Sequence, residues 1–500
     1  MALALRWPNL TAGPEWGIEP VPRESRTLGT FDNAVLWGNL GFSLLLLVTG
    51  SFLVPAMGLG QALLAILLGA LIGNALLALA AVMGAETGLP AMVLYRAPLG
   101  IRGSYVASLA TLVRNVAWGT LALVLVAEVA TTLSERGLGW GARPVWVIVF
   151  GGLGTAMAVL GPIDVVRKWF RRFWFWLVLL VAAVVGLSGY MEFGVPAMLQ
   201  RAPAGGWPSF WQGVDLVIAL PVAWLPLAAD YSRFAKAPRS AFLGTFAGSF
   251  IATVWFCALG VLYLPAVNAE DLVGWLLGGM PIGLMALLVA LMMEGDGAFA
   301  NVYSASVSAQ NVAPQVGRRG LAVTVGAISI VLALAVNLLH YENVLLLIGS
   351  LFVPLFGILA ADYFLVRRRR LDTAALYRAD GAFWYRGGVN AAALAVWLAG
   401  FLLYNWISPG TVTWWVNAMD ALFAGLLRLP FPLGSEVTWL GASIPAFLAT
   451  FVLYALVGTW MNRRKPAAKG TPTKPREPAV TGTQMDHREP VAAKKVGDAG

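Results

Sequence analysis

The stretch with the clearest capacity for chemistry is an apolar segment, residues 213–233, that is interrupted in its middle by two prolines. Pro221 and Pro226 each remove a backbone donor and clash with the preceding helical turn, so a helix through this segment must kink or break. Within a membrane, the freed backbone groups must be satisfied by protein or by a water-filled cavity. Trp224 lies between the prolines, where a flat ring could meet a flat ligand. A kinked packing helix would carry the same prolines, but the combination with Trp224 favours a ligand site at mid-depth.

A second chemical stretch, residues 288–311, places two carboxylates inside another apolar segment. Glu294 and Asp296 alternate with glycines, and Asn301 follows. Hard cations prefer carboxylate, hydroxyl and carbonyl oxygens, and the nearby hydroxyls belong to Ser304, Ser306 and Ser308. Charged groups within a membrane span usually mark an ion or proton path. The segment therefore predicts a cation or proton site, with the Asn301 amide suited to the edge of an amide-like ring.

A third stretch combines Arg114, Asn115 and Trp118 within residues 103–133. Arg114 and Trp118 are four residues apart and so share one face of a helix. An arginine at this depth is costly and normally faces a bundle interior or a water cavity. Two interpretations follow. Arg114 either locks two helices as an ion pair with one of the carboxylates at 294 and 296, or faces the ligand site.

The composition places these stretches in a membrane protein. The chain has 500 residues, of which 59% are hydrophobic and 12% are charged, whereas soluble proteins carry about 25% charged residues. One cysteine and two histidines leave no basis for a disulfide framework, a Cys-ligated cluster or a His-based metal site. We expect no cofactor.

Twelve apolar segments are long enough to span a bilayer. They are residues 33–55, 58–83, 103–133, 144–163, 170–190, 211–232, 240–265, 281–309, 320–338, 343–366, 388–408 and 438–461. With the N-terminus inside, 29 of the 34 Lys and Arg lie in inner segments and 4 in outer segments. This asymmetry predicts a multi-pass protein of the cell membrane (the inner or plasma membrane) with both termini in the cytoplasm. It also accounts for the net charge of +9 without any nucleic-acid partner.

The interruptions recur at an interval of five segments. Glycines at positions 38 and 41 interrupt the first segment and prolines the sixth, while the third and the eighth are polar. Small residues in the first segment would also serve close helix packing. Two five-helix repeats of opposite topology would produce this interval. We predict an all-α fold with repeats at 33–190 and 211–366, two extra helices within 388–461, and cytoplasmic tails at 1–32 and 462–500.

The tails carry few structural signals. Residues 1–32 have no apolar core typical of a signal peptide, so we expect no cleavage. Asp32 is a candidate N-cap for the first span. Residues 462–500 are rich in Lys, Pro, Gly and Thr and are expected to be disordered.

Several short motifs give the sequence a family resemblance. They are ESRTLG at 24–29, PLGIRGS at 98–104, AADYFLVRRRRLDTAALYR at 360–378 and YRGGVN at 385–390. Over roughly residues 15–410 the chain resembles the nucleobase–cation symporter-1 family. The stretches PVAWLPLAADYSR at 221–233 and NVYSASVSAQN at 301–311 look most like the branch of cytosine permeases and hydroxymethylpyrimidine transporters.

The resemblance implies a five-plus-five inverted-repeat fold of the LeuT type, alternating access, and a substrate held between two tryptophans. Those tryptophans fall on Trp118 and Trp224, and a family asparagine falls on Asn301. Where the hydantoin transporter has a substrate-binding glutamine, this chain has Ala122, so hydantoin itself is not expected. The remaining residues predicted to line the substrate site are Asn115, Ser43, Ala122 and Ala223.

The family's sodium site is implied to involve backbone carbonyls of Asn39, Phe42 and Met292. Its two hydroxyl ligands fall on Gly295 and Asp296, which leaves a carboxylate where the family has hydroxyls. With Glu294 beside it, this departure keeps both Na⁺ and H⁺ open as the coupling ion.

The predicted function is secondary active import of a planar, nucleobase-like compound of the cytosine or hydroxymethylpyrimidine type, driven by cation symport. A purine or an allantoin-type substrate is the alternative within the class. An intramembrane enzyme is disfavoured because no GxSxG or HExxH motif is present. A channel is disfavoured because the filter residues of channels usually form rings contributed by symmetric subunits, whereas this chain has two broken helices within one predicted inverted repeat. The lipid bilayer and the small substrate are the only partners implied.

Overall fold

Every regular element in the described part of the chain is helical, apart from two isolated bridges at Leu28–Ala235 and Arg386–Val389. The computed structural model describes residues 16–161, 176, 183, 203–263, 283–335, 341–410, 412–437 and 439–464, with only the backbone described at 44–45, 136, 283–296, 341–346 and 464. The predicted fifth span, 170–190, falls almost wholly outside these residues, as does the tail beyond 464. The all-α prediction is confirmed for the part described.

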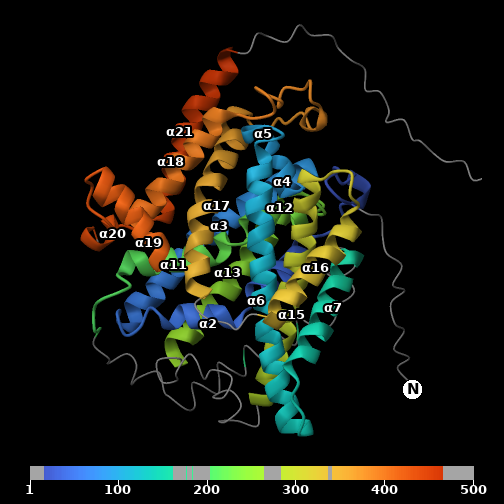
Figure 1. Cartoon of the computed structure of the whole chain (residues 1–500), viewed down its shortest axis with the longest axis vertical. Coiled ribbons are helices and arrows are strands. Elements are labelled where there is room, and N and C mark those ends of the chain that lie inside the picture. Colours follow the sequence, from blue (N-terminus) through green and yellow to red (C-terminus); the bar gives the residue numbers. More distant parts are fainter. Residues whose placement is uncertain are drawn as a thin grey trace, which may run out of the picture.

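The long helices run roughly side by side (Figure 1). The elements of the first half are α1(Thr30–Gly41), α2(Leu44–Ser51), α3(Leu59–Thr87), α4(Ala91–Leu94), α5(Arg96–Leu99), α6(Ser104–Leu138) and α7(Arg143–Leu160). Those of the second half are α11(Phe210–Val222), α12(Leu225–Ser232), α13(Pro238–Tyr263), α15(Gly283–Val312), α16(Arg318–Ala335) and α17(Tyr341–Ala360), the last continuing into a π-helical turn, η5(Ala361–Val366). The remaining elements are α18(Ala391–Ile407), α19(Thr413–Asp420), a π-helical turn η7(Ala421–Leu426), α20(Leu433–Glu436) and α21(Ser443–Arg464), with 3₁₀ turns η1(Arg23–Ser25) and η6(Ala374–Tyr377).

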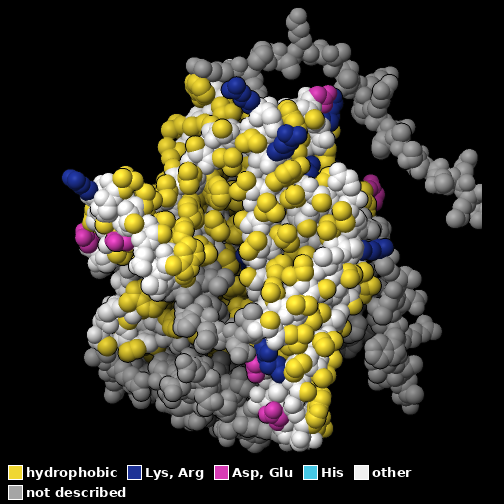
Figure 2. All heavy atoms as spheres, viewed as in Figure 1, with side chains coloured by type: hydrophobic (Ala, Val, Ile, Leu, Met, Phe, Trp, Pro, Cys, Tyr) yellow, Lys and Arg dark blue, Asp and Glu magenta, His cyan; other side chains and the backbone are white. Residues whose placement is uncertain are grey.

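The outer surface of the bundle matches a lipid environment. Among the described residues, 8 helices are long and apolar enough to cross a membrane. Figure 2 shows hydrophobic side chains over the middle of one face and most charged side chains toward its ends and edges. Leu109 and Val113 on α6 and Ile148 and Leu153 on α7 are at least half exposed. Because such exposure is costly in water, these faces belong against lipid. The predicted count of twelve spans stays a prediction.

Both predicted interruptions are present. The first span divides into α1 and α2 at Phe42, which takes an extended conformation with φ −84° and ψ 117°. The sixth span divides into α11 and α12 at Ala223 and Trp224. Pro221 lies in the last turn of α11 and Pro226 in the first turn of α12, so the two prolines mark the two sides of the break.

The expectation that Asp32 is an N-cap is wrong by three positions. The helix begins at Thr30, and Gly29 occupies the N-cap. Asp32 lies at the third helical position, where its carboxylate accepts a hydrogen bond from the Gly29 backbone N–H at 2.9 Å. This hydrogen bond, from the N-cap N–H to the side chain at the third helical position, is one of the two bonds of a capping box.

Helix contacts occur in the pairs that an inverted repeat requires. α1 packs against α13 and α11 against α3, which are equivalent pairs if the first span matches the sixth and the second matches the seventh. In the same way α6 packs against α16 and α15 against α7. α6 and α15 pack along each other, as the third and eighth spans would on a pseudo-twofold axis.

Close approach at the breaks depends on glycine. A Cβ at Gly248 on α13 would collide with the backbone carbonyl of Ala34, and a Cβ at Gly73 on α3 would lie 2.5 Å from the ring of Pro221. Gly38 and Gly41 face Gly248 and Ala252 on α13. The small residues of the first span thus serve helix packing, and they do so directly beside a break in the helix.

Candidate functional site

Trp118 and Trp224 face a common group in the middle of the bundle. Trp118 lies on α6 and Trp224 at the break between α11 and α12, so the pair combines the third and the sixth predicted spans. The guanidinium carbon of Arg114 lies 5.6 Å from the Trp118 ring centroid and 5.5 Å from that of Trp224. Both tryptophans are half-buried, whereas Arg114 is buried. The two predicted stacking residues are therefore brought together around an arginine.

Two amides hold Arg114 in place. Its Nη1 donates to Asn115 Oδ1 at 2.6 Å and to Asn301 Oδ1 at 2.7 Å. Asn301 also donates from Nδ2 to the Gly297 carbonyl at 2.8 Å. Both ends of the Asn301 amide are thus engaged within the protein, so its predicted role at a substrate edge is left to the remaining lone pair of its oxygen.

The predicted ion pair of Arg114 stays a prediction, because its expected partners, Glu294 and Asp296, lie outside the part of the chain whose side chains are described. No carboxylate in that part lies within ion-pair distance of Arg114. Its described contacts come from amides and aromatic rings.

Trp37 is a further residue of the site that sequence reasoning missed. It is buried on α1, one turn before the break, with its ring 6.2 Å from that of Trp224 in an edge-to-face arrangement. Its ring also lies 6.1 Å from that of Tyr231, whose hydroxyl donates to the Ala300 carbonyl at 2.8 Å. Trp37 therefore packs edge-to-face against Trp224. The available signal was an aromatic residue directly before Gly38 in an interrupted span.

The other predicted lining residues lie at the two breaks or at the α6–α15 interface. Ala223 is buried at the α11–α12 break, and Ser43 follows Phe42 at the α1–α2 break. Ala122 is buried on α6, with its Cβ 3.6 Å from the position that a Cβ at Gly297 would take. At the position where the resemblance placed a substrate-binding glutamine, Ala122 thus packs against α15 instead.

The predicted cation residues are only partly described. Asn39 is buried at the end of α1, and neither its Nδ2 nor its Oδ1 has a hydrogen-bond partner in the described structure. The Asn39 carbonyl accepts from the Phe42 N–H at 3.1 Å. Met292, Glu294, Gly295 and Asp296 lie in the helical backbone of α15, which contacts α1. The structure therefore places the two helices together without describing the carboxylates.

One end of the bundle is tied by a buried arginine, Arg233. We call this the basic end, because it holds residues 233–239 and 367–370. Arg233 donates from Nη1 to the Gly17 carbonyl, from Nη2 to the Trp16 carbonyl at 3.0 Å and to Tyr303 Oη at 2.7 Å, and from Nε to the Asp230 carbonyl at 3.2 Å. All three guanidinium nitrogens therefore have partners.

Further bonds at the basic end join distant segments. Asp230 accepts from the Ala91 backbone N–H at 2.8 Å and from Ser304 Oγ. Leu28 donates to the Phe234 carbonyl, and Lys236 donates to the Leu28 carbonyl, both at 2.9 Å. Ser304, which the sequence placed on a cation path, thus has its hydroxyl committed to Asp230.

The motifs that carried the resemblance also meet at this end. Arg26 donates to four carbonyls at the C-terminus of α3 and at Val21. Arg96 donates to Asn311 Oδ1 at 2.8 Å and lies over the Tyr377 ring, whose hydroxyl donates to the Ile18 carbonyl at 2.6 Å. Burial lowers the pKa of the Arg96 guanidinium, an effect opposed by Tyr377, and burial raises the pKa of the Tyr377 hydroxyl above its ordinary range. These motif residues are therefore structural.

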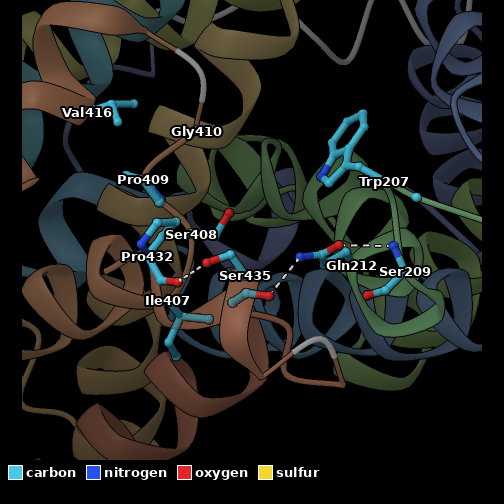
Figure 3. Close-up of a pocket in the computed structure, with 12 residues that line it drawn as sticks. Trp207, Ser209, Gln212, Ile407, Ser408, Pro409, Gly410, Val416, Pro432 and Ser435 are labelled. Carbon is cyan, nitrogen blue, oxygen red and sulfur yellow. Dashed lines mark hydrogen bonds between the residues drawn. The ribbon is translucent and has the colours of Figure 1, made fainter. Parts of the chain in front are cut away.

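A pocket of about 600 Å³ lies away from all these groups, where the start of α11 meets the end of α18 and α20 (Figure 3). Gln212 crosses it, accepting from the Ser209 N–H at 2.9 Å and donating to the Gly434 carbonyl at 3.3 Å. The pocket is lined by Trp207, serines, prolines and other uncharged residues. Since it offers no charged group and no pair of facing rings, it is not the candidate site.

The fold and the central site define a class of protein. Two helices broken at mid-span meet polar helices around buried, incompletely paired side chains within an apolar bundle, which is the arrangement of a secondary transporter. Three comparisons with known proteins agree with this class. Residues 20–425 match the family described as permease for cytosine/purines, uracil, thiamine, allantoin. The chain belongs to this family.

Individual relatives share a low sequence identity with this chain, but they align with it over most of its length. The hydantoin permease of Microbacterium maritypicum is 25% identical over 450 residues, covering 86% of this chain and 89% of that protein. The putative allantoin permease of Escherichia coli is 25% identical over 456 residues, covering 81% and 92%. The structure of Mhp1, a nucleobase-cation-symport-1 family transporter in a closed conformation with bromovinylhydantoin bound, superposes with a TM-score of 0.71 at 20% identity, covering 89% and 95%. The family resemblance is thereby confirmed, and the chain is a multi-pass membrane transporter rather than an enzyme.

Proposed function

We propose that this transporter carries a planar, nucleobase-like ring across the cell membrane by cation symport with alternating access. The observation that carries the proposal is the pair Trp118 and Trp224, which come from different halves of the chain and both face the guanidinium of Arg114. Both lie on helices that are polar or broken at mid-span. Stacking between two such rings selects flat ligands largely regardless of their substituents.

The substrate edge would be read by the amides and the guanidinium beside the rings. Asn115 Nδ2 has no hydrogen-bond partner in the described structure, and Asn301 Oδ1 has a lone pair beyond the one that Arg114 uses. Ala122, Ala223 and Ser43 supply small surfaces around this point. We favour a pyrimidine of the cytosine or hydroxymethylpyrimidine type, with a purine or allantoin-type substrate as the alternative.

The coupling cation would bind between α1 and α15. The unpaired amide of Asn39 is a polar group buried at the α1 break, which favours a polar ligand there. We propose that carbonyls of Asn39, Phe42 and Met292 act together with Asp296 at the Gly295 turn, with Glu294 as the second carboxylate. Oxygen donors of this kind fit Na⁺, and the carboxylate would equally carry H⁺.

The arrangement in the membrane follows from charge. We propose that the basic end faces the cytoplasm together with both termini, because segments at that end hold most of the Lys and Arg. We also retain residues 33–190 and 211–366 as the two inverted repeats.

Counterflow in proteoliposomes tests the function. Vesicles loaded with an unlabelled ring should take up the labelled ring faster than empty vesicles, because a carrier exchanges and a channel does not. The panel is cytosine, uracil, hypoxanthine, allantoin, orotate and urate. A chain that exchanges none of them, although reconstituted and folded, does not have the proposed function.

Coupling is tested with Asp296→Asn, which keeps the side-chain size and removes its charge. The variant should lose accumulation against a gradient but keep exchange. In the wild type, a requirement for Na⁺ at fixed pH assigns sodium, and uptake that follows the pH gradient without Na⁺ assigns protons. Accumulation that persists in Asp296→Asn moves the role to Glu294.

A further inference from the structure

Arg114 lies beside both tryptophan rings on which the substrate ring is expected to stack, and this position bears on the substrate. Its guanidinium lies within 5.6 Å of both tryptophan ring centroids. Nη1 is held by the oxygens of Asn115 and Asn301, at 2.6 and 2.7 Å. The guanidinium is therefore fixed in orientation by neutral groups and surrounded by aromatic faces.

The remaining donors of Arg114 form one free edge. Nε and Nη2 are buried and have no hydrogen-bond partner in the described structure. These two nitrogens point their N–H groups to the same side of the guanidinium plane, and this side is the fork that binds two oxygens in parallel. The Asn115 Nδ2 donor beside it is unpaired as well. Three nitrogen donors of Arg114 and Asn115 are thus left without an acceptor among the described residues.

The charge of Arg114 is also unbalanced in the residues that the structure describes. Its amide and aromatic contacts carry no negative charge. Asp230, the buried acidic residue of α12, accepts hydrogen bonds from Ala91 and Ser304. A buried cation with free donors is costly unless an anion completes it. No described residue supplies that anion, and a planar group that brings two acceptor oxygens and negative charge would complete the site.

We infer that the substrate is a planar heterocycle with an anionic oxygen edge, bound with its ring between Trp118 and Trp224 and its edge on the Nε–Nη2 fork of Arg114. This inference rests on the proposed function, but it replaces the neutral cytosine-type ring favoured there with an anionic ring of the same planar class. Either a ring carboxylate or a delocalised ring anion would supply the edge. A neutral ring would leave the charge of Arg114 unbalanced, and a cationic ring would be repelled by it.

Equilibrium binding of labelled rings to the purified, full-length protein tests the inference. Orotate, a carboxylated uracil, is compared with orotamide, its neutral amide. Urate, a ring anion at pH 7, is compared with neutral hypoxanthine. Each anion should bind about tenfold or more tightly than its neutral counterpart in at least one pair, because a bidentate charged contact is gained. The pair that shows the preference distinguishes a carboxylate from a ring anion.

Variants of Arg114 connect the preference to the fork. Arg114→Gln should bring the anion and its neutral counterpart within about twofold of each other while neutral rings still bind. Arg114→Lys keeps the charge but offers no planar fork, so an intermediate preference is expected. Arg378→Gln is the matched control, because Arg378 is exposed and paired with Asp380 at 2.8 Å; it should leave the preference unchanged.

The outcomes separate this inference from the function beneath it. Equal binding of anionic and neutral rings by the wild type, or a preference that survives in Arg114→Gln, overturns the inference and leaves nucleobase transport standing. Failure of every ring in binding and in counterflow overturns both. If Arg114→Gln does not fold, the two wild-type pairs and Arg114→Lys still decide.

Discussion

Two buried arginines in this transporter differ in how completely their guanidinium groups are hydrogen-bonded. Arg233 and Arg114 are 0% and 4% exposed. At the basic end, every guanidinium nitrogen of Arg233 donates to a carbonyl or a hydroxyl. At the centre, only Nη1 of Arg114 has partners, and Nε and Nη2 have none in the described structure.

The difference separates a structural role from a binding role. The partners of Arg233 are largely backbone carbonyls from segments far apart in sequence, so its bonds hold those segments together. The partners of Arg114 are two side-chain amides and two half-buried rings, so its bonds orient it and leave one edge open. Incomplete pairing of a buried charge marks a position where stability has been given up for a ligand.

The largest expected effect is a loss of stability on replacing Arg233, which tests its contrast with Arg114. Arg233→Met removes a network of donors and leaves several buried carbonyls unpaired, so the folded state should lose about 3 kcal/mol or more. Arg114→Met removes an incompletely paired charge and unpairs only the oxygens of Asn115 and Asn301, so the loss of stability should be clearly smaller than for Arg233→Met. Thermal unfolding of both variants in the same detergent measures the contrast. Equal losses in the two variants would mean that Arg114 is a structural residue like Arg233.

The next effect concerns the rings on either side of Arg114. Trp118→Ala and Trp224→Ala should each weaken ring binding about tenfold, because stacking contributes about 1–3 kcal/mol per base. Phe at either position should restore part of the loss. The matched control is Trp207→Ala at the peripheral pocket, where affinity should not change. Wild-type affinity in both central variants would show that the rings do not form the substrate site.

A smaller effect sharpens the role of the amide that holds Arg114. Asn301→Ala removes one acceptor from Nη1, which should free the guanidinium and weaken the binding of anionic rings by about 1 kcal/mol. The protein should remain folded. Binding assays and thermal unfolding together distinguish this role from packing, which would change the unfolding temperature and leave affinity intact.

The smallest effect tests redundancy at the basic end. Tyr303→Phe removes one acceptor of Arg233, while Nη2 keeps the Trp16 carbonyl. We expect a loss of about 1 kcal/mol in stability and no change in ring affinity. A change in affinity without a change in stability would connect Tyr303 to the substrate site.

The sequence predicted the features that depend on local chemistry. Pro221 and Pro226 mark the break in the sixth span because proline acts on its own turn, and Gly38 and Gly41 indicated the interruption and the packing of the first. The meeting of Trp118 and Trp224 came from the family resemblance. Contacts between distant segments were not predictable. An ion pair with a carboxylate was one of two interpretations of Arg114, and its contact with Asn301 depends on the packing of α6 against α15. Trp37 was missed because aromatic residues in membrane helices are common. Asp32 was misplaced because the helix begins two residues before it.

The bond pair between Leu28 and the end of α12 gives the protein a built-in reporter of its working cycle. The Leu28 N–H donates to the Phe234 carbonyl and the Lys236 N–H donates to the Leu28 carbonyl. The Arg233 guanidinium donates to the carbonyls of Trp16 and Gly17. Any motion that parts the basic end must break these bonds first. The two amide protons should then exchange with deuterated solvent at a rate set by how often that end opens. Substrates and ions that close or open this end should slow or speed that exchange, and mass spectrometry of the peptides around 28 and 236 would measure the effect without any attached probe.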